Sequence, residues 1–256
     1  MKKQSFIFFL ITLCAAFIVV GAYADETFEN IESMTIDDFD SAETLNGSDR
    51  AFTWTIRASK FIGTTGEGDS KELDLEWKLV PGYPSALYKR DDAEGKDLNV
   101  IGVRGGFTRK GFNYLEFIPV GKDTSDGEKL YPIELRGRIK TVSMWVWGAN
   151  FNYYIDIHLR DSNGIDHTIR LGDTKFEGWR NLSVHIPTAI AQVKRYTTKG
   201  EALSLTKIVV WTRPGEKVDN FYIYFDQLRM VTDTFITKFD GDELADVEKI
   251  WASDGQ

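Results

Sequence analysis

The stretch KTVSMWVW, residues 140–147, begins the part of the chain that decides the fold. Five similar segments follow it before residue 232, and in each of them apolar and polar side chains alternate. They read YYIDIHLR (153–160), DHTIRL (166–171), RNLSVHI (180–186), TKIVVWT (206–212) and NFYIYFDQLRMV (220–231). Alternation with a period of two places successive side chains on opposite faces and is typical of half-buried β-strands. The region 139–232 is therefore predicted to hold six strands.

Four segments nearer the N-terminus show the same alternation, at 50–57, 72–79, 98–103 and 112–118. A hairpin turn is indicated by the composition of Asp161-Ser162-Asn163-Gly164. The strand pattern is expected to be interrupted at Glu177-Gly178-Trp179, before the next strand. Many short strands separated by turns indicate a sandwich or barrel rather than a parallel sheet with crossover helices. The sequence predicts an all-β, antiparallel, jelly-roll-like β-sandwich.

Helix signals are few. Residues 187–196 begin with Pro187 and carry Ile190 and Val193 three positions apart, which permits about two helical turns. We therefore expect one or two short helices joining strands. Residues 119–132 read as a long exposed loop, and the acidic tail 233–256 is expected to be loosely ordered or docked onto a neighbour.

The N-terminus has the three parts of a secretory signal. Lys2 and Lys3 precede an apolar run, and the run ends before Ala22-Tyr23-Ala24, where small residues stand at the positions that a signal peptidase reads. The run of about 15 residues is shorter than the ~20 that a membrane-spanning helix needs. The predicted organisation is a signal peptide at 1–24, a β-sandwich at 25–232 and a tail at 233–256, with no membrane span in the mature chain.

Charge and cysteine content narrow the possible partners. The chain has 31 basic and 39 acidic residues, and removal of the leader leaves 29 basic against the same 39 acidic residues. The resulting net negative charge argues against nucleic acid as a partner, because phosphate binding needs clustered positive charge. The only cysteine, Cys14, lies inside the leader and follows Leu13, whereas a lipid-attachment site would have a small residue there. The mature domain must therefore fold without disulfides.

No catalytic constellation emerges from the sequence. The mature chain has no cysteine nucleophile and no Gly-x-Ser-x-Gly elbow. His158, His167 and His185 each lie in a strand pattern, without the spacing of zinc ligands. Paired carboxylates could serve a glycosidase, but Asp156 and the other strand acids read equally well as polar strand faces. The protein is predicted not to be an enzyme and to need no cofactor.

Aromatic residues are abundant, with 7 Trp, 10 Tyr and 17 Phe. Trp145 and Trp147 share one face of their strand, and Tyr222 and Tyr224 share one face of theirs. Exposed aromatics can stack on sugar rings, whereas covered ones would lie under a loop or in a subunit contact. These four residues form the predicted interaction surface.

Acidic residues stand near both ends of the predicted domain. Asp38 and Asp40 open it, and Asp226 lies in the last long strand. The first and last strands of a jelly roll are often neighbours, and oxygen ligands from both can hold a structural Ca²⁺. The alternative is that the three acids are simply solvated.

A family resemblance rests on six motifs that occur in order. They are IDDFD (36–40), VSMWVWG (142–148), YYIDIHLRD (153–161), FEGWRNL (176–182), IP (186–187) and YIYFDQL (222–228). In this order they resemble the FlaA family, the outer-layer (sheath) proteins of spirochaete periplasmic flagellar filaments. The resemblance covers about residues 30–235 and is strongest from 139 to 232. The same spacing is shared more loosely with jelly-roll carbohydrate-binding modules.

The resemblance implies a structural protein of the periplasm. Such a subunit would coat a core of flagellins together with other sheath proteins, and would contribute to filament shape, stiffness and motility. A sheath subunit needs contacts that do not close on themselves, and exposed aromatic patches can provide them. The alternative function is an exported carbohydrate-binding module that acts alone.

Overall fold

The computed structural model describes residues 30–45, 48–63, 75–87, 97–122, 129–192 and 202–234. All described strands belong to the compact unit that begins at Ile31. The signal peptide predicted at 1–24 and tail residues 235–256 lie outside the described residues.

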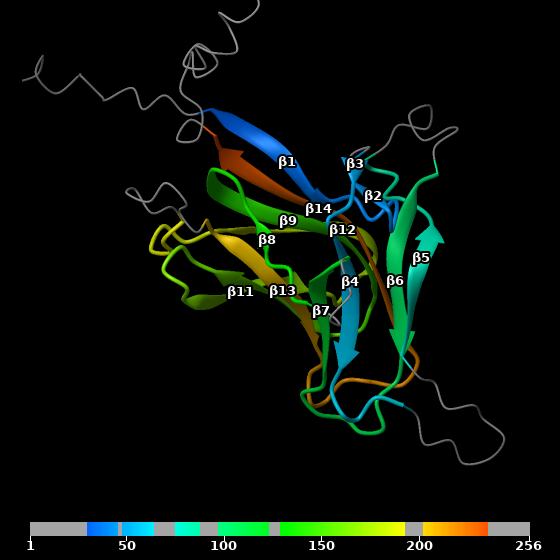
Figure 1. The fold of residues 1–256 in the computed structure, drawn as a ribbon. Coiled ribbons are helices and arrows are strands. Elements are labelled where there is room, and N and C mark those ends of the chain that lie inside the picture. Colours follow the sequence, from blue (N-terminus) through cyan, green and yellow to red (C-terminus); the bar gives the residue numbers. More distant parts are fainter. Residues whose placement is uncertain are drawn as a thin grey trace, which may run out of the picture. The chain divides into compact units, whose positions relative to one another are not determined.

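The described residues form strands and connecting turns, with no helix among them (Figure 1). In chain order the strands are β1 (Ile31–Asp37), β2 (Thr44–Leu45), β3 (Ser48–Asp49), β4 (Phe52–Ala58), β5 (Glu76–Pro81), β6 (Asn99–Gly105), β7 (Tyr114–Gly121), β8 (Ile133–Glu134), β9 (Arg138–Ala149), β10 (Tyr154–Arg160), β11 (Asp166–Asp173), β12 (Glu177–His185), β13 (Ser204–Trp211) and β14 (Phe221–Asp233).

Two antiparallel six-stranded sheets contain most of these strands. Sheet 1 has the order β12-β9-β14-β6-β5, with β1 also paired to β14, and sheet 2 has the order β11-β10-β13-β7-β4, with β8 also paired to β13. The remaining pair, β2 and β3, forms a small ribbon. The predicted all-β antiparallel sandwich is confirmed, and strands distant in sequence, such as β1 and β14, lie side by side (Figure 1).

The core fills the space between the two sheets. Inward side chains of β9 and β14, such as Met144 and Phe225, belong to the same buried cluster as Ile157 of β10 and Ile208 of β13. Phe117 of β7 meets Phe225 of β14 edge to face, with ring centroids 5.0 Å apart. Each fully buried side chain of this size contributes about 1.5–3 kcal/mol. Burial between the sheets therefore stabilises a described domain that contains no cysteine.

The structure differs from the expectations at three connections. Residues 187–192 form a turn rather than the expected helix, because their polar groups bond to other segments: the Gln192 amide pairs with the backbone of Ile139 at 2.6 and 3.0 Å. Residues 193–196 of the same prediction lie outside the described residues. β7 runs on to Gly121, so the loop expected from 119 begins later. The break expected at 177–179 is absent, because Gly178 takes a positive φ of 81° within an unbroken β12 register.

Candidate functional site

The outer face of sheet 1 collects the aromatic residues singled out in the sequence. In the cross-strand register Trp179 of β12 lies opposite Trp147 of β9, and Trp147 lies opposite Tyr224 of β14. Trp145 and Tyr222 lie two residues from Trp147 and Tyr224, which places them on the same face. We call Trp145, Trp147, Trp179, Tyr222 and Tyr224 the aromatic face. The four predicted interaction residues are thus brought together.

The rings of this face support one another. Trp147 stacks on Tyr222 with centroids 5.7 Å apart and meets Tyr224 edge to face at 5.6 Å. Phe151, from the turn after β9, meets the edge of Tyr222 at 6.3 Å. Aromatic pairs of this kind contribute about 0.5–1.5 kcal/mol beyond their burial. The face is therefore a rigid, preformed surface on which Tyr222 is 41 % exposed.

A cleft of about 430 Å³ opens beside this face, over β5, β6 and β14. Its floor depends on Gly102 of β6, because a Cβ there would lie 2.9 Å from two ring carbons of Tyr224. Tyr222 and Trp77 also line the cleft, and Trp77 is 42 % exposed. The absence of a side chain at Gly102 is what lets the Tyr224 ring lie against the strand.

Charged groups from two adjacent strands stand at the rim of the cleft. Arg104 of β6 pairs with Glu76 of β5, with nitrogen–oxygen distances of 2.9 and 2.7 Å. Both side chains are more than half exposed, so the pair contributes little to stability. Lys78 and Asn220 complete the polar lining. The cleft thus combines aromatic surface with hydrogen-bonding groups of both kinds.

The outer face of sheet 2 has a different character. Ion pairs cross its strands, and Arg170 and Arg213 both stack on the ring of Tyr154, at 3.7 and 5.0 Å. The pairs are Arg160–Asp166, Arg170–Asp156, Lys207–Glu116 and Arg213–Asp173. This face also carries three rings, because Trp211 packs against Tyr114 and Tyr154 with centroids 5.3 and 6.4 Å apart. The two outer faces differ in that the charges named here are paired across strands and none of these three rings is as exposed as Tyr222 of the aromatic face.

Asp226 lies next to the aromatic face, opposite Trp145 in the register. Its side chain is 1 % exposed, and its Oδ1 accepts a hydrogen bond from the Gln227 backbone N–H at 2.7 Å. Burial, together with the negative charges of Asp40, Asp38 and Asp37, raises the pKa of Asp226 to about 8. The three acids of the calcium prediction are therefore close enough to interact electrically.

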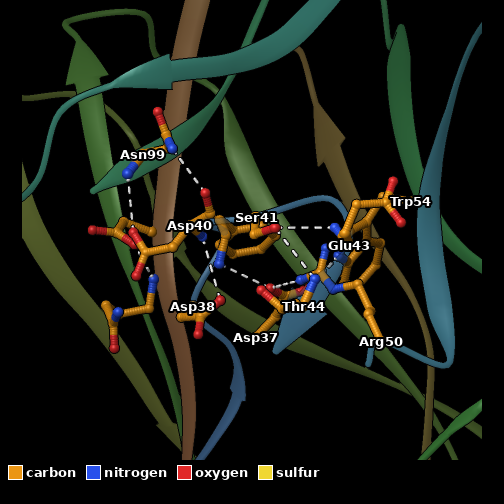
Figure 2. A network of polar contacts seen from close by, with 12 residues as sticks. Asp37, Asp38, Asp40, Ser41, Glu43, Thr44, Arg50, Trp54 and Asn99 are labelled. Atoms are coloured by element: carbon orange, nitrogen blue, oxygen red, sulfur yellow. Dashed lines mark hydrogen bonds and ion pairs between the residues drawn. The ribbon is translucent and has the colours of Figure 1, made fainter. Parts of the chain in front are cut away.

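The end of β1 and the turn after it carry Asp37, Asp38 and Asp40, and hydrogen bonds fix this segment (Figure 2). Asp40 accepts a hydrogen bond from the Asn99 backbone N–H at 2.9 Å, and the Asn99 side chain donates to the Asp40 carbonyl oxygen. Asp37 pairs with Arg50 and accepts a hydrogen bond from the Trp54 indole at 2.6 Å. Burial raises the pKa of Asp37, while Arg50 and Trp54 oppose that rise.

A metal site at these acids stays a prediction. Within the described ranges, no group of three or more His, Cys, Asp or Glu side chains has an arrangement that could hold a metal ion. Calcium takes 6–8 oxygen ligands, so binding would have to draw Asp38, Asp40 and Asp226 closer and displace the proton that burial favours on Asp226.

The three histidines lie in strands, as their sequence patterns indicated, and each has a polar partner. His158 and His185 contact the hydroxyls of Thr168 and Thr141, at 3.2 and 3.0 Å. His167 contacts Asp161 at 3.0 Å, and the same carboxylate accepts backbone hydrogen bonds that close the hairpin turn after β10. Among the described residues His158 Nε2 is buried without a hydrogen-bond partner, so the contact with Thr168 satisfies only one nitrogen of that ring.

Sequence reasoning missed Trp179 and the residues of the cleft. Trp179 lies in the segment 177–179, which the sequence predicts to separate two strands. The alternation of Asn181 and Ser183, extended backwards by two residues, indicates instead that Trp179 lies on the outer face. The sequence assigns Gly102 only to the strand expected at 98–103 and assigns no functional role to Arg104. Their role depends on the β14–β6 pairing, in which Gly102 meets Tyr224 and Arg104 meets Tyr222.

The fold and the exposed rings define an antiparallel β-sandwich domain with an aromatic outer face. Within that class, the chain belongs to the family of flagellar filament outer layer proteins, FlaA, whose family model matches residues 80–240. The resemblance drawn from the six sequence motifs is confirmed. Membership implies a flagellar location.

A curated relative supports the same assignment. A flagellar filament outer layer-like protein of Brachyspira hyodysenteriae (strain ATCC 49526 / WA1) is 28 % identical over 149 residues. The match covers 57 % of this chain and 64 % of the relative, so the chain spans less than two thirds of the relative's length.

Solved structures that the chain matches include carbohydrate-binding modules. The family 11 module of a Clostridium thermocellum cellulase is 14 % identical, with 78 % of this chain and 95 % of that chain covered and a TM-score of 0.38. A family 61 module solved with β-1,4-galactotriose is 13 % identical, with 70 % and 88 % covered and a TM-score of 0.35. Separately, the described part of the chain contains no helix long and apolar enough to cross a membrane.

Proposed function

We propose that this chain is a structural subunit of the outer layer, or sheath, of the periplasmic flagellar filament. The observation that carries the proposal is family membership over residues 80–240. The subunit would be exported by the leader at 1–24, would contact flagellin core subunits and other sheath proteins, and would contribute to filament shape, stiffness and motility. It would act by assembly rather than by catalysis.

The aromatic face is the surface we assign to the contact within the filament. Its rings are preformed and partly exposed, and the opposite face of the sandwich has its charges paired within the domain. A stable protein contact buries on the order of 1,000 Å² or more in total, with aromatic residues enriched at its centre. A subunit in a helical coat uses one surface to contact a different surface of its neighbour, so that the assembly stays open. An aromatic patch on one face of the domain can serve as one of these two surfaces.

Binding to stripped filaments tests this assignment. Filaments isolated from cells that lack this protein are mixed with the purified mature chain and sedimented. We expect the unaltered chain to sediment with them, and the double variant Trp147→Ala/Tyr222→Ala to bind at least about tenfold more weakly. Arg160→Ala, on the outer face of sheet 2, is the matched control and should bind normally. An unaltered chain that stays in the supernatant would count against the proposal.

The alternative from the sequence, an exported carbohydrate-binding module acting alone, keeps one observation in its favour. The cleft beside the aromatic face combines exposed rings with charged hydrogen-bonding groups. A module acting alone would bind a polysaccharide and be absent from purified filaments, so the location of the protein in its native cell separates the two functions.

A further inference from the structure

We propose that the cleft over β5, β6 and β14 binds the pyranose ring of a saccharide. This inference concerns the cleft itself, which shares Tyr222 and Tyr224 with the aromatic face. In a sheath subunit a saccharide and the filament partner would therefore compete for these two residues, whereas in a free module the cleft would be open. Its volume of about 430 Å³ falls within the range of small-molecule sites.

The Tyr224 ring lines the cleft where β6 and β14 meet. Gly102 contributes no side chain, so the Tyr224 ring lies directly against β6, where a Cβ would approach it to 2.9 Å. Trp147 and Tyr222 also meet the Tyr224 ring edge to face, with centroids 5.6 and 6.3 Å apart. A ring fixed by such contacts loses little conformational entropy when a ligand packs on it. Pyranose rings present flat C–H faces that pack well on such surfaces.

Two further rings stand where a bound saccharide would meet them. Tyr222 and Trp77 line the same cleft, and both remain about two-fifths exposed. A side chain of this size that is left open to water on a folded domain gains from apolar contact with a ligand. Their polar tips, the Tyr hydroxyl and the Trp indole N–H, can also form hydrogen bonds to a ligand.

The rim supplies the groups that hydroxyls need. Arg104 offers several N–H donors and Glu76 offers carboxylate acceptors, from neighbouring strands and within hydrogen-bonding distance of each other. A pair so exposed is worth little by itself, so a ligand can share its hydrogen bonds at small cost. Adjacent hydroxyls on a sugar both donate and accept, which matches a rim that carries both signs. An aliphatic ligand would leave these groups unused.

The test is binding of the mature chain to a panel of soluble saccharides. Affinity gel electrophoresis with mixed-linkage β-glucan, xylan, galactan and chito-oligosaccharides identifies a ligand, and titration calorimetry then measures Kd. We expect Gly102→Ala, which pushes the Tyr224 ring from its place, to weaken binding at least about tenfold. Tyr222→Ala and Arg104→Ala should do the same, and neither removes a buried side chain, so folding is preserved in at least these two variants.

Phe112→Ala is the matched control, because Phe112 is 65 % exposed and does not line the cleft. It should bind as the unaltered chain does. Failure of every saccharide to bind, or binding that survives all three cleft variants, overturns the proposal. If the cleft variants instead abolish sedimentation with filaments while no saccharide binds, the cleft is a protein contact. The saccharide proposal then fails, and the filament role is unaffected.

Discussion

The Asp37 carboxylate accepts a 2.6 Å hydrogen bond from the indole nitrogen of Trp54, which joins the first strand of sheet 1 to an edge strand of sheet 2. Both side chains are buried, and Arg50 completes the group as an ion-pair partner of Asp37. The Phe39 backbone N–H donates to the same carboxylate at 2.8 Å. This cluster ties the start of the domain to its core and shapes the turn that carries Asp38 and Asp40.

Replacing Asp37 with Ala is expected to destabilise the domain by about 3–5 kcal/mol, because it leaves the Arg50 guanidinium buried without its partner. Urea unfolding followed by tryptophan fluorescence measures the loss. Glu43→Ala is the control, since its ion pair with Lys122 is at the surface and its removal should leave stability almost unchanged. Equal stability of the Asp37→Ala variant and the unaltered chain would show that the buried pair is not needed.

Asp226 should make the stability of the metal-free domain depend on pH. Its pKa is about 8 in the folded chain against 3.8 for an ordinary aspartate, so between these values the folded state holds the extra proton. The free energy of unfolding should therefore fall as the pH rises from about 4 to about 8. The Asn side chain of the Asp226→Asn variant cannot ionise. Near pH 8, with chelator present, the free energy of unfolding of this variant should exceed that of the unaltered chain by on the order of 1–3 kcal/mol.

Urea unfolding at pH 5 and pH 8, with chelator present, measures this effect as the difference between the two proteins. Taking the difference cancels the titration of every other group. A gap that is the same at both pH values, or that widens toward pH 5, would mean that Asp226 is ionised throughout.

Calcium binding at Asp38, Asp40 and Asp226 is expected to raise the melting temperature, because a ligand of the folded state alone stabilises it. Differential scanning fluorimetry with added CaCl₂ and with chelator makes the comparison. The rise should disappear in Asp226→Asn. If chelator leaves the melting temperature of the unaltered chain unchanged, these acids form a protonated, hydrogen-bonded cluster instead of a cation site.

The alternation of apolar and polar residues was sufficient to predict most strands of the two sheets. Trp145 and Trp147 alternate with Met144 and Val146, and the structure puts the first pair outside and the second in the core. β1 escaped prediction because its partner, β14, lies about 200 residues away and its own side chains do not alternate in hydrophobicity. Local propensity cannot show such a pairing.

The candidate site was predicted only in part, for a similar reason. Tyr222 and Tyr224 were found on one strand and Trp147 on another, but nothing in the sequence states that Trp147 and Tyr224 are cross-strand neighbours. The cleft depends on the third strand, where Gly102 matters for the side chain that it lacks. A glycine within a strand signals a close approach of another group, yet the approaching ring becomes known only from the register.

The sequence of the leader predicts where the mature chain begins. Cleavage after Ala24 should leave Asp25 as the first residue, because Ala22 and Ala24 are the small residues that a signal peptidase reads. Intact-mass measurement of the protein from its native cell checks this. A species that retains Met1, or that carries a lipid on Cys14, would contradict it.

The central claim, that this chain is a component of the filament outer layer, is tested most directly on filaments purified from the native cell. Quantitative mass spectrometry of washed filaments should find the chain in a fixed ratio to flagellin, and cells that lack it should have filaments of altered thickness or curvature. A chain that is present in the cell but absent from washed filaments, with filaments unchanged by its deletion, would contradict the account.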